Sequence, residues 1–192
     1  MLDDLAGHLG RVLASRSRRV LERPEKIVAA VLVPLVAVAG EPHLLFTRRS
    51  TALRHHQGQI SFPGGRRDSG VDTSLEATAL REAEEEIGLA PDEVQLIGAL
   101  DDIETLSTQF VITPFVGLVA RPGPWRPDPR EVDAVFTVAV RYLRAPGVAR
   151  RETWDFQGRP VEIDLYDADG HVIWGATQRI THNLLGLLEP IV

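Results

Sequence analysis

The sequence predicts a protein that mixes helices and strands, either α+β or an α/β/α sandwich, and three observations support this fold class. Apolar residues at helical spacing occur near both ends of the chain and once in the middle. Valine-rich runs typical of strands lie between these helices. The chain has 192 residues, of which 44% are hydrophobic and 25% charged, and this composition excludes disorder as the main state. We therefore expect one domain over residues 1–192, with residues 1–24 as an N-terminal helical extension.

The first third of the chain predicts a helix followed by a β-hairpin. Leucines and a valine recur at helical spacing, which predicts an amphipathic helix over residues 2–22, and Pro24 ends it. The run IVAAVLVPLVAVAG, residues 27–40, reads as a buried strand that is interrupted or edged at Pro34. A turn at residues 40–42 leads into a second strand, HLLFTRR, which would pair with the first.

A long loop and then the clearest helix of the chain follow. Residues 50–73 are dense in Gly, Arg, His and Asp, and a loop of this length inside a compact domain is usually either functional or disordered. Apolar spacing predicts a helix over residues 74–87. Thr73 and Glu76 form a capping-box pattern at its start, and Gly88 is placed to end it in the left-handed conformation.

Strands dominate the second half of the chain. Three are expected, in the segments VQLIGAL, FVITPFVGLVA and VDAVFTVAV, and the proline-rich loop RPGPWRPDPR separates the last two. Two shorter strands flank a turn at Asp169-Gly170. A final amphipathic helix is expected from Thr177 to Leu188.

Composition excludes several classes of function. The chain has no cysteine, so it has no disulfide framework, no cysteine-ligated zinc and no cysteine nucleophile. Its formal net charge of −6 disfavours non-specific binding to nucleic acid or to an anionic membrane. Asp3 and Asp4 stand where a secretory signal would be basic, and the longest apolar run is too short to span a bilayer. We therefore expect a cytoplasmic protein that binds neither nucleic acid nor membrane.

The helix in the middle of the chain carries a patch of acidic side chains. Glu82, Glu85 and Glu86 are spaced three and four residues apart, so they are neighbours on the helix surface. Three converging carboxylates would suit Mg²⁺ or Mn²⁺, and Arg81 could pair with Glu85 or orient a ligand carboxylate. The alternative is that the acidic run is only a solvated helix face.

The loop before this helix favours the metal-site interpretation. The segment QISFPGGRRD places two glycines, Gly64 and Gly65, shortly before the acidic helix. Paired glycines allow the backbone to approach a ligand closely. Because protein-bound magnesium is commonly held by a few carboxylates together with substrate phosphates, the combination predicts a polyphosphate site.

At this point the sequence resembles a known family. The segment REAEEEIGL, which begins at Arg81, resembles the second half of the Nudix box, R-E-U-x-E-E-x-G-U. In the usual box a Gly and a Glu stand 14 and 8 residues before the Arg, where this chain has Arg67 and Thr73. Gly65 lies 16 residues before Arg81, so we infer a two-residue extension of the loop. The candidates to replace the missing glutamate are Asp68, Asp72 and Glu76.

A second motif resembles a subfamily of Nudix hydrolases, the coenzyme A pyrophosphatases. Their signature, L-L-T-x-R-S-x-x-x-R-x-x-x-G-x-x-x-F-P-G-G, is matched from Leu45 to Gly65 except at Phe46, and the later stretch WGAT is also similar. Arginine binds phosphate bidentately, so local positive charge here suits a phosphorylated nucleotide, although each arginine could instead pair with a surface carboxylate. Of the adjacent pair His55 and His56, at most one is expected to touch substrate. The substrate-binding candidates are Arg48, Arg49, Arg54, His55, Gly64 and Gly65.

The resemblance implies a Nudix-type α/β/α sandwich with a mixed β-sheet, and it implies a metal-dependent enzyme with a small-molecule substrate. Metal-activated water would attack the pyrophosphate of coenzyme A and release 3′,5′-ADP and 4′-phosphopantetheine, with Mg²⁺ or Mn²⁺ as cofactor. The expected metal ligands are Glu82, Glu85 and Glu86, and the expected catalytic residues are Arg81, Glu85, Glu131 and Glu104. Three glutamates compete for the role of general base, and Glu131 is preferred over Glu104 and Glu85 because the base commonly lies on a separate loop in this superfamily. The alternatives are a Nudix pyrophosphatase for ADP-ribose or a nicotinamide dinucleotide, or a non-catalytic Nudix-fold binding module.

Overall fold

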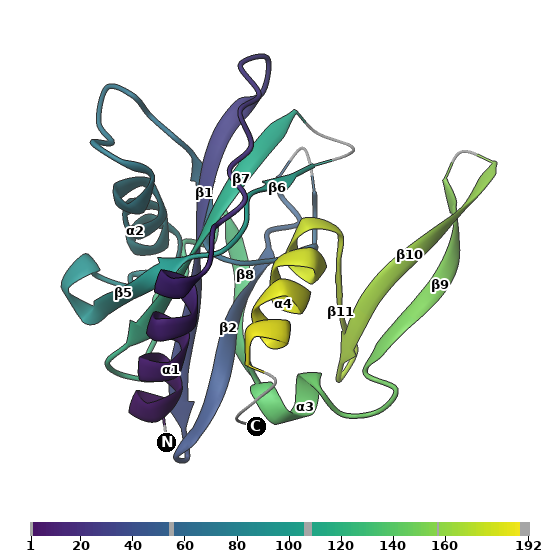
Figure 1. Cartoon of the computed structure of the whole chain (residues 1–192). Coiled ribbons are helices and arrows are strands. Elements are labelled where there is room, and N and C mark those ends of the chain that lie inside the picture. Colours follow the sequence, from purple (N-terminus) through teal and green to yellow (C-terminus); the bar gives the residue numbers. More distant parts are fainter. Residues whose placement is uncertain (1, 54–55, 106–108, 157, 189–192) are drawn as a thin grey trace.

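The computed structural model describes residues 2–53, 56–105, 109–156 and 158–188. Three layers make up its main body: helix α2 covers one face of a mixed sheet, and α1 and α4 cover the other face (Figure 1). The helices are α1 (Leu2–Ser15), α2 (Leu75–Ile87), α3 (Val140–Leu143) and α4 (Gly175–Leu187), with a 3-10 turn η1 at Pro91–Glu93. The strands are β1 (Ile27–Val38), β2 (Glu41–Arg49), β3 (Ile60–Ser61), β4 (Gly64–Arg66), β5 (Val94–Ala99), β6 (Ile103–Glu104), β7 (Phe110–Val119), β8 (Val132–Ala139), β9 (Ala149–Phe156), β10 (Arg159–Ala168) and β11 (His171–Trp174). This is the fold class that the sequence predicts.

The main sheet is mixed because its two central strands are parallel. Its order is β3-β2-β1-β7-β5, and β4, β6 and β8 pair with β1, β7 and β2 respectively. β1 runs parallel to β7, and the other pairings in this sheet are antiparallel. A separate three-stranded sheet, β11-β10-β9, extends from the main body (Figure 1).

Each face of the main sheet has its own apolar core. Alternate residues of β1 point to opposite faces, so Val33 and Leu35 pack with α1 and α4, whereas Leu32 and Val36 pack with α2. The core under α2 is built from small and branched residues, including Ala79 and Ala83 of the helix. This lets the helix lie close to the strands and fixes the direction of its remaining side chains.

Strand β1 is continuous through Pro34, which corrects the expected interruption. Pro34 lies opposite Gly117 of β7. Leu32 donates its N–H to Pro63 on the opposite edge, so Pro34, two residues on, also directs its nitrogen to that edge. There β1 changes partners, from β4 up to Val31 to β2 from Leu35. A residue without an N–H is tolerated at this gap between partners.

The hairpin between β1 and β2 is present, but its turn is one residue earlier than expected. Val38 pairs with Glu41, which leaves Ala39 and Gly40 as the two turn residues. Both have positive φ, 50° and 82°, as the hairpin turn that matches the strand twist requires. Glu41 and Pro42 are therefore the first residues of β2 rather than part of the turn.

Helix α1 ends at Ser15, seven residues before the end that the periodicity predicts. The segment after it is held by two carboxylates far away in the sequence. Asp101 accepts hydrogen bonds from the Arg16 side chain and from the Arg19 backbone N–H. Asp102 accepts from the Arg18 side chain and the backbone N–H of Leu21. These contacts replace the helical hydrogen bonds that residues 16–22 would otherwise make.

The C-terminal part of the chain contains two elements that the sequence did not predict. Strand β9 is mostly exposed and half of its residues are charged, and α3 is a single turn. The two expected short strands are present as β10 and β11, and their turn, Asp169-Gly170, has positive φ at both residues. α4 begins at Gly175, two residues before the expected start. Among the described residues no helix is long and apolar enough to cross a membrane.

Candidate active site

Helix α2 is fixed at both ends by local caps. The Ser74 hydroxyl accepts a hydrogen bond from the Ala77 N–H, so Ser74 rather than Thr73 is the N-cap. Gly88 adopts the left-handed conformation, with φ of 67°, and its N–H bonds back to the last turn. The adjoining proline-rich loop is tied to the same end, because Arg126 and Asp128 donate their N–H groups to Ile87 and Glu86.

Two glutamates of α2 lie against the glycine pair of the preceding loop. Glu86 is buried, with 3% of its surface exposed, and its Oε2 accepts the Gly64 N–H at 3.3 Å. A Cβ on Gly65 would overlap the Glu82 carboxylate. A Cβ on Gly64 would overlap the Ala30 carbonyl oxygen, and its φ of 152° also favours glycine. The two glycines are therefore required for the close approach of β4 to β1 and to the acidic helix.

The site carries concentrated negative charge in a poorly solvated position. Burial raises the pKa of Glu86 to about 8, and the neighbouring charges of Glu82 and Glu131 act in the same direction. Arg49 and the Gly64 N–H oppose this rise in the pKa of Glu86. Burial also raises the pKa of Glu82, against the opposing effect of Arg81. Two buried carboxylates in this state gain from a nearby cation.

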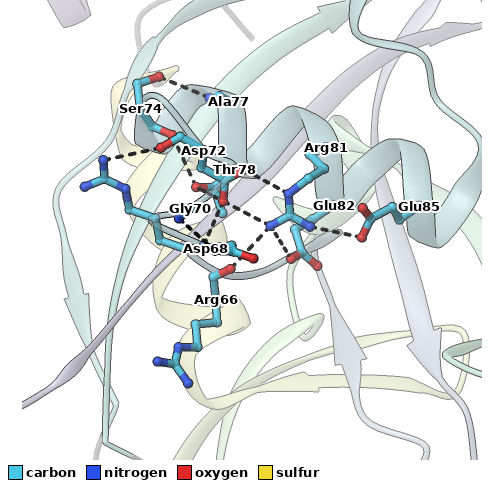
Figure 2. Close-up of polar contacts among 11 residues, drawn as sticks. Arg66, Asp68, Gly70, Asp72, Ser74, Ala77, Thr78, Arg81, Glu82 and Glu85 are labelled. Carbon is cyan, nitrogen blue, oxygen red and sulfur yellow. Dashed lines mark hydrogen bonds and ion pairs between the residues drawn. The ribbon is translucent and has the colours of Figure 1, made fainter.

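Arg81 organises the polar network at the start of the site (Figure 2). Its guanidinium group binds Asp72 through Nε at 2.8 Å and Nη2 at 3.1 Å, and it also reaches Glu82 at 2.8 Å and Glu85 at 3.0 Å. Asp72 is buried and accepts a further hydrogen bond from the Thr78 hydroxyl at 2.9 Å. The Arg81 guanidinium therefore holds the pKa of Asp72 well below its usual range.

Of the three candidates for the missing glutamate of the box, the structure brings Asp72 to the arginine. The longer loop makes a tight turn in which the Asp68 carbonyl accepts the N–H groups of Val71 and Asp72. The Asp72 carboxylate in turn accepts the Asp68 N–H at 2.8 Å, while Asp68 caps Gly70 instead of meeting Arg81. The turn accommodates the two-residue extension of the loop, and the Asp72 carboxylate still contacts Arg81 (Figure 2).

Glu85, the third predicted metal ligand, is more exposed than Glu82 and Glu86, although its charge also raises the pKa of Glu82. Its side chain is 60% exposed and is paired with Arg81 on the outer side of the helix (Figure 2). Within the described ranges, no group of three or more acidic or histidine side chains is arranged to hold a metal ion. Glu82 and Glu86 still fit a hard divalent cation, since both present carboxylate oxygens, Glu86 is buried and Glu82 is partly buried, and the charge of Glu82 raises the pKa of Glu86. They are the pair that would hold Mg²⁺ or Mn²⁺.

The two loop glutamates considered as bases lie in different electrostatic surroundings. Glu131 is exposed, and its charge raises the pKa values of both Glu82 and Glu86. Its carbonyl oxygen accepts the Ser50 N–H, which places it at the end of β2. Glu104 instead pairs with Lys26 at 2.6 Å, and this contact lowers its pKa.

The predicted substrate-binding arginines are separated by the strand that carries them. Arg49 acts electrostatically on Glu86, and its buried Nε has no hydrogen-bond partner among the described residues. Arg48 is exposed, and as the preceding residue of β2 it points to the opposite face of the sheet. Arg54 and His55 lie outside the described residues. The neighbouring His56 is exposed and contacts Gln59 through its Nδ1.

Comparison with known proteins identifies the family. The family model described as the NUDIX domain matches residues 26–157. The Nudix hydrolase NudL of Salmonella typhimurium (strain LT2) is 37% identical over 178 residues, covering 92% of this chain and 90% of the relative. NudL of Salmonella enteritidis PT4 shows the same identity and coverage. The chain belongs to the Nudix hydrolase family.

Solved structures of this family share the fold. A MutT/nudix family protein from Enterococcus faecalis aligns with 96% of this chain and 74% of its own length, at 14% identity and a TM-score of 0.59. The NUDIX domain of Shewanella oneidensis NrtR, solved with ADP ribose, aligns with 68% of this chain and 82% of its own length, at 17% identity and a TM-score of 0.50. At these identities the likeness concerns the fold alone.

Proposed function

We propose that this Nudix hydrolase cleaves the pyrophosphate bond of coenzyme A, giving 3′,5′-ADP and 4′-phosphopantetheine, with Mg²⁺ or Mn²⁺ as cofactor. One observation carries the proposal. The two motifs meet in space, because Arg49 from the motif that resembles coenzyme A pyrophosphatases acts on Glu86 of the acidic helix, beside Gly64. This proximity supports a site in which Arg49 binds phosphate beside carboxylates that bind the metal.

Each residue of the site has a separate role in this proposal. Glu82 and Glu86 hold the divalent cation, which when bound lowers the pKa of water and neutralises phosphate oxygens. Arg81 touches no reacting atom; it positions Glu82, and Asp72 fixes Arg81 in turn. Arg49 contacts the pyrophosphate bidentately as the phosphorus–oxygen bond breaks.

Glu131 is our choice of general base. It is a solvent-exposed carboxylate close enough to Glu82 and Glu86 to raise the pKa of each. A carboxylate in this position accepts the proton of the attacking water and releases it to solvent. Glu104 is already neutralised by Lys26 and is the weaker choice, and Glu85 is occupied by Arg81.

The substrate is tested by comparing coenzyme A with dephospho-coenzyme A, which lacks only the 3′-phosphate. A hydrogen bond to a charged group contributes roughly 1.5–3 kcal/mol, so we expect kcat/KM to be about tenfold to a hundredfold lower for the dephosphorylated compound. Arg54→Ala, at the remaining arginine of the motif, should erase part of this preference, whereas Arg49→Ala should lower turnover of both compounds alike. ADP-ribose and NADH belong in the same panel, because a higher kcat/KM for either would replace coenzyme A as the substrate.

A further inference from the structure

Strand β9 is an unprotected sheet edge on a projecting part of the molecule. Together with β10 and β11 it forms a three-stranded sheet, called the arm below, which extends away from the main body (Figure 1). β9 pairs with β10 along its whole length, from Ala149 opposite Tyr166 to Phe156 opposite Arg159, without a register shift. No described strand pairs with its other edge. A regular eight-residue edge without proline is a template for pairing with another strand.

One face of the arm is aromatic and partly exposed. The ring of Trp154 meets that of Trp174 edge-on at a centroid distance of 5.3 Å, and the Phe156 ring lies 6.4 Å from both. Phe156 is 41% exposed and Val161 is 39% exposed. Trp154 and Phe156 are two residues apart on β9, so they share this face and reach the free edge. Exposed aromatic side chains of this kind are enriched in protein interfaces.

Basic residues lie at the start of β9 and acidic residues lie later, so the strand is complementary in charge to an antiparallel copy of itself. Arg150 and Arg151 stand at its beginning, and the acidic residues Glu152 and Asp155 follow. An antiparallel copy of the same strand would reverse this order and bring basic residues towards acidic ones. Self-complementarity of this type is what a two-fold symmetric interface requires.

We propose that a second copy of this chain pairs with the arm, β9 against β9, antiparallel about a two-fold axis at Thr153. This register places Arg151 opposite Asp155 of the other copy, and no like charges face each other. Axes at Arg151, Glu152 or Asp155 would put identical charges face to face, which is destabilising. An axis at Trp154 would create no opposite-charge pair.

The dimer joins the two arms into one six-stranded sheet. Its backbone hydrogen bonds satisfy the free edges of both copies, and the aromatic faces become continuous across the axis because Trp154 of each copy lies diagonal to the other. The main sheets and their active sites lie outside the pairing strands, so each copy keeps a complete site.

Substitutions at the axis test this interface directly. Thr153 contacts Glu162 of its own chain, so lysine at this position is compatible with the folded monomer. In the dimer, Thr153→Lys and the double variant Thr153→Glu/Glu162→Gln would each place two identical charges opposite one another; the second change of the double variant removes the like charge that glutamate at 153 would face on β10 of its own chain. We expect wild type to have a mass of twice 21.1 kDa by light scattering after gel filtration, and each variant to have the single-chain mass with an unchanged circular dichroism spectrum.

An equimolar mixture of the two variants should restore dimer formation. Lysine on one copy then faces glutamate on the other, so the double mass should return. The matched control is Gln95→Lys, an exposed position on β5, which is the edge strand at one end of the main sheet; it should keep the wild-type mass. A single-chain mass for wild type at every concentration, a double mass for Thr153→Lys, or a mixture that stays at single mass would overturn the proposal.

Discussion

Two glutamates of helix α2 lower the stability of the folded protein, because their carboxylates are largely removed from water. Their presence is explained if the function requires them. Burial removes hydration from Glu82 and Glu86 and raises the pKa of each, and the charge of Glu82 raises the pKa of Glu86 further. Replacing either with glutamine removes a charge and keeps the shape. We expect Glu82→Gln and Glu86→Gln to lower metal-dependent turnover by orders of magnitude, while the free energy of unfolding without metal stays equal or rises.

The control for this prediction is Glu84→Gln, which removes an exposed carboxylate from the same helix. It should leave both turnover and stability near the wild-type values. Kinetics with Mg²⁺ and with Mn²⁺, together with urea unfolding in a chelator, measure the two quantities. Near-normal turnover in both the Glu82 and Glu86 variants would contradict their assignment as metal ligands.

The choice between the two loop glutamates is also decided at single residues. Glu131→Gln should lower kcat far more than it weakens binding of the metal, because the group acts on water rather than on the cation. Glu104→Gln should leave kcat nearly unchanged, since its carboxylate pairs with Lys26. Metal titration beside steady-state kinetics separates binding from turnover. A silent Glu131→Gln with a damaging Glu104→Gln would reverse the assignment.

At the scale of elements, the bond between Arg81 and Asp72 fastens the loop that follows β4 to helix α2. Because the pKa of Asp72 is depressed in the folded protein, the unfolded chain binds its proton first as pH falls. The bond therefore stabilises the fold above the ordinary carboxyl pKa and loses this effect in acid. We expect Asp72→Asn to be less stable than wild type by about 2 kcal/mol at neutral pH.

The difference between the two proteins should shrink as pH falls below about 4, where the wild-type carboxyl begins to gain its proton in the unfolded state. Urea unfolding of both proteins across this range measures it. Asp92→Asn, at an exposed position in η1, is the control and should show no such pH-dependent difference. A gap between Asp72→Asn and wild type that is constant with pH would contradict the role given to this ion pair.

Elements whose limits are set locally were predicted well from the sequence, and those set by distant contacts were not. Helix α2 has its cap and its terminating glycine within the same short segment, and both ends were predicted to within a residue. The end of α1 depends on Asp101 and Asp102, some eighty residues away, so its own periodicity predicted too long a helix. β9 was missed because its apolar residues are few and its charged ones dominate.

In the candidate site, too, the residues defined by local spacing were predicted, and those defined by the folded geometry were not. The glutamates of α2 were found because they repeat at helical spacing in a known motif. Asp72 could only be narrowed to three candidates, since the geometry of the Asp68 turn decides which carboxylate returns to Arg81. The opposite directions of Arg48 and Arg49 follow from the alternation of a strand, a signal that was available once β2 had been recognised.

At the scale of the whole molecule, Asp102 joins three segments that are distant in sequence. Its buried carboxylate accepts hydrogen bonds from Arg18, from the backbone of Leu21 and from the hydroxyl of Thr113 on β7, the last at 2.7 Å. Asp102→Ala would leave these donors unpaired and release the segment after α1. We expect a loss of stability on the order of 3 kcal/mol, measured by urea unfolding.

Amide hydrogen exchange shows which part of the chain accounts for the loss of stability in Asp102→Ala. Amides of residues 16–22 should exchange faster in Asp102→Ala, whereas those of α2 should change only as much as global stability does. Asp92→Ala, which removes an exposed carboxylate, should change neither quantity. Unchanged exchange at residues 16–22 would show that this segment is held by its other contacts.

The turn between Asp68 and Asp72 has a consequence for the spacing between the glycine pair and helix α2. The turn holds two residues more than the usual Nudix box and still places a carboxylate beside Arg81. The contact that fastens the loop to α2 therefore depends on where the Asp72 carboxylate arrives and not on a fixed number of residues before it. In this chain the loop is longer while Arg81 keeps its contacts to Glu82 and Glu85.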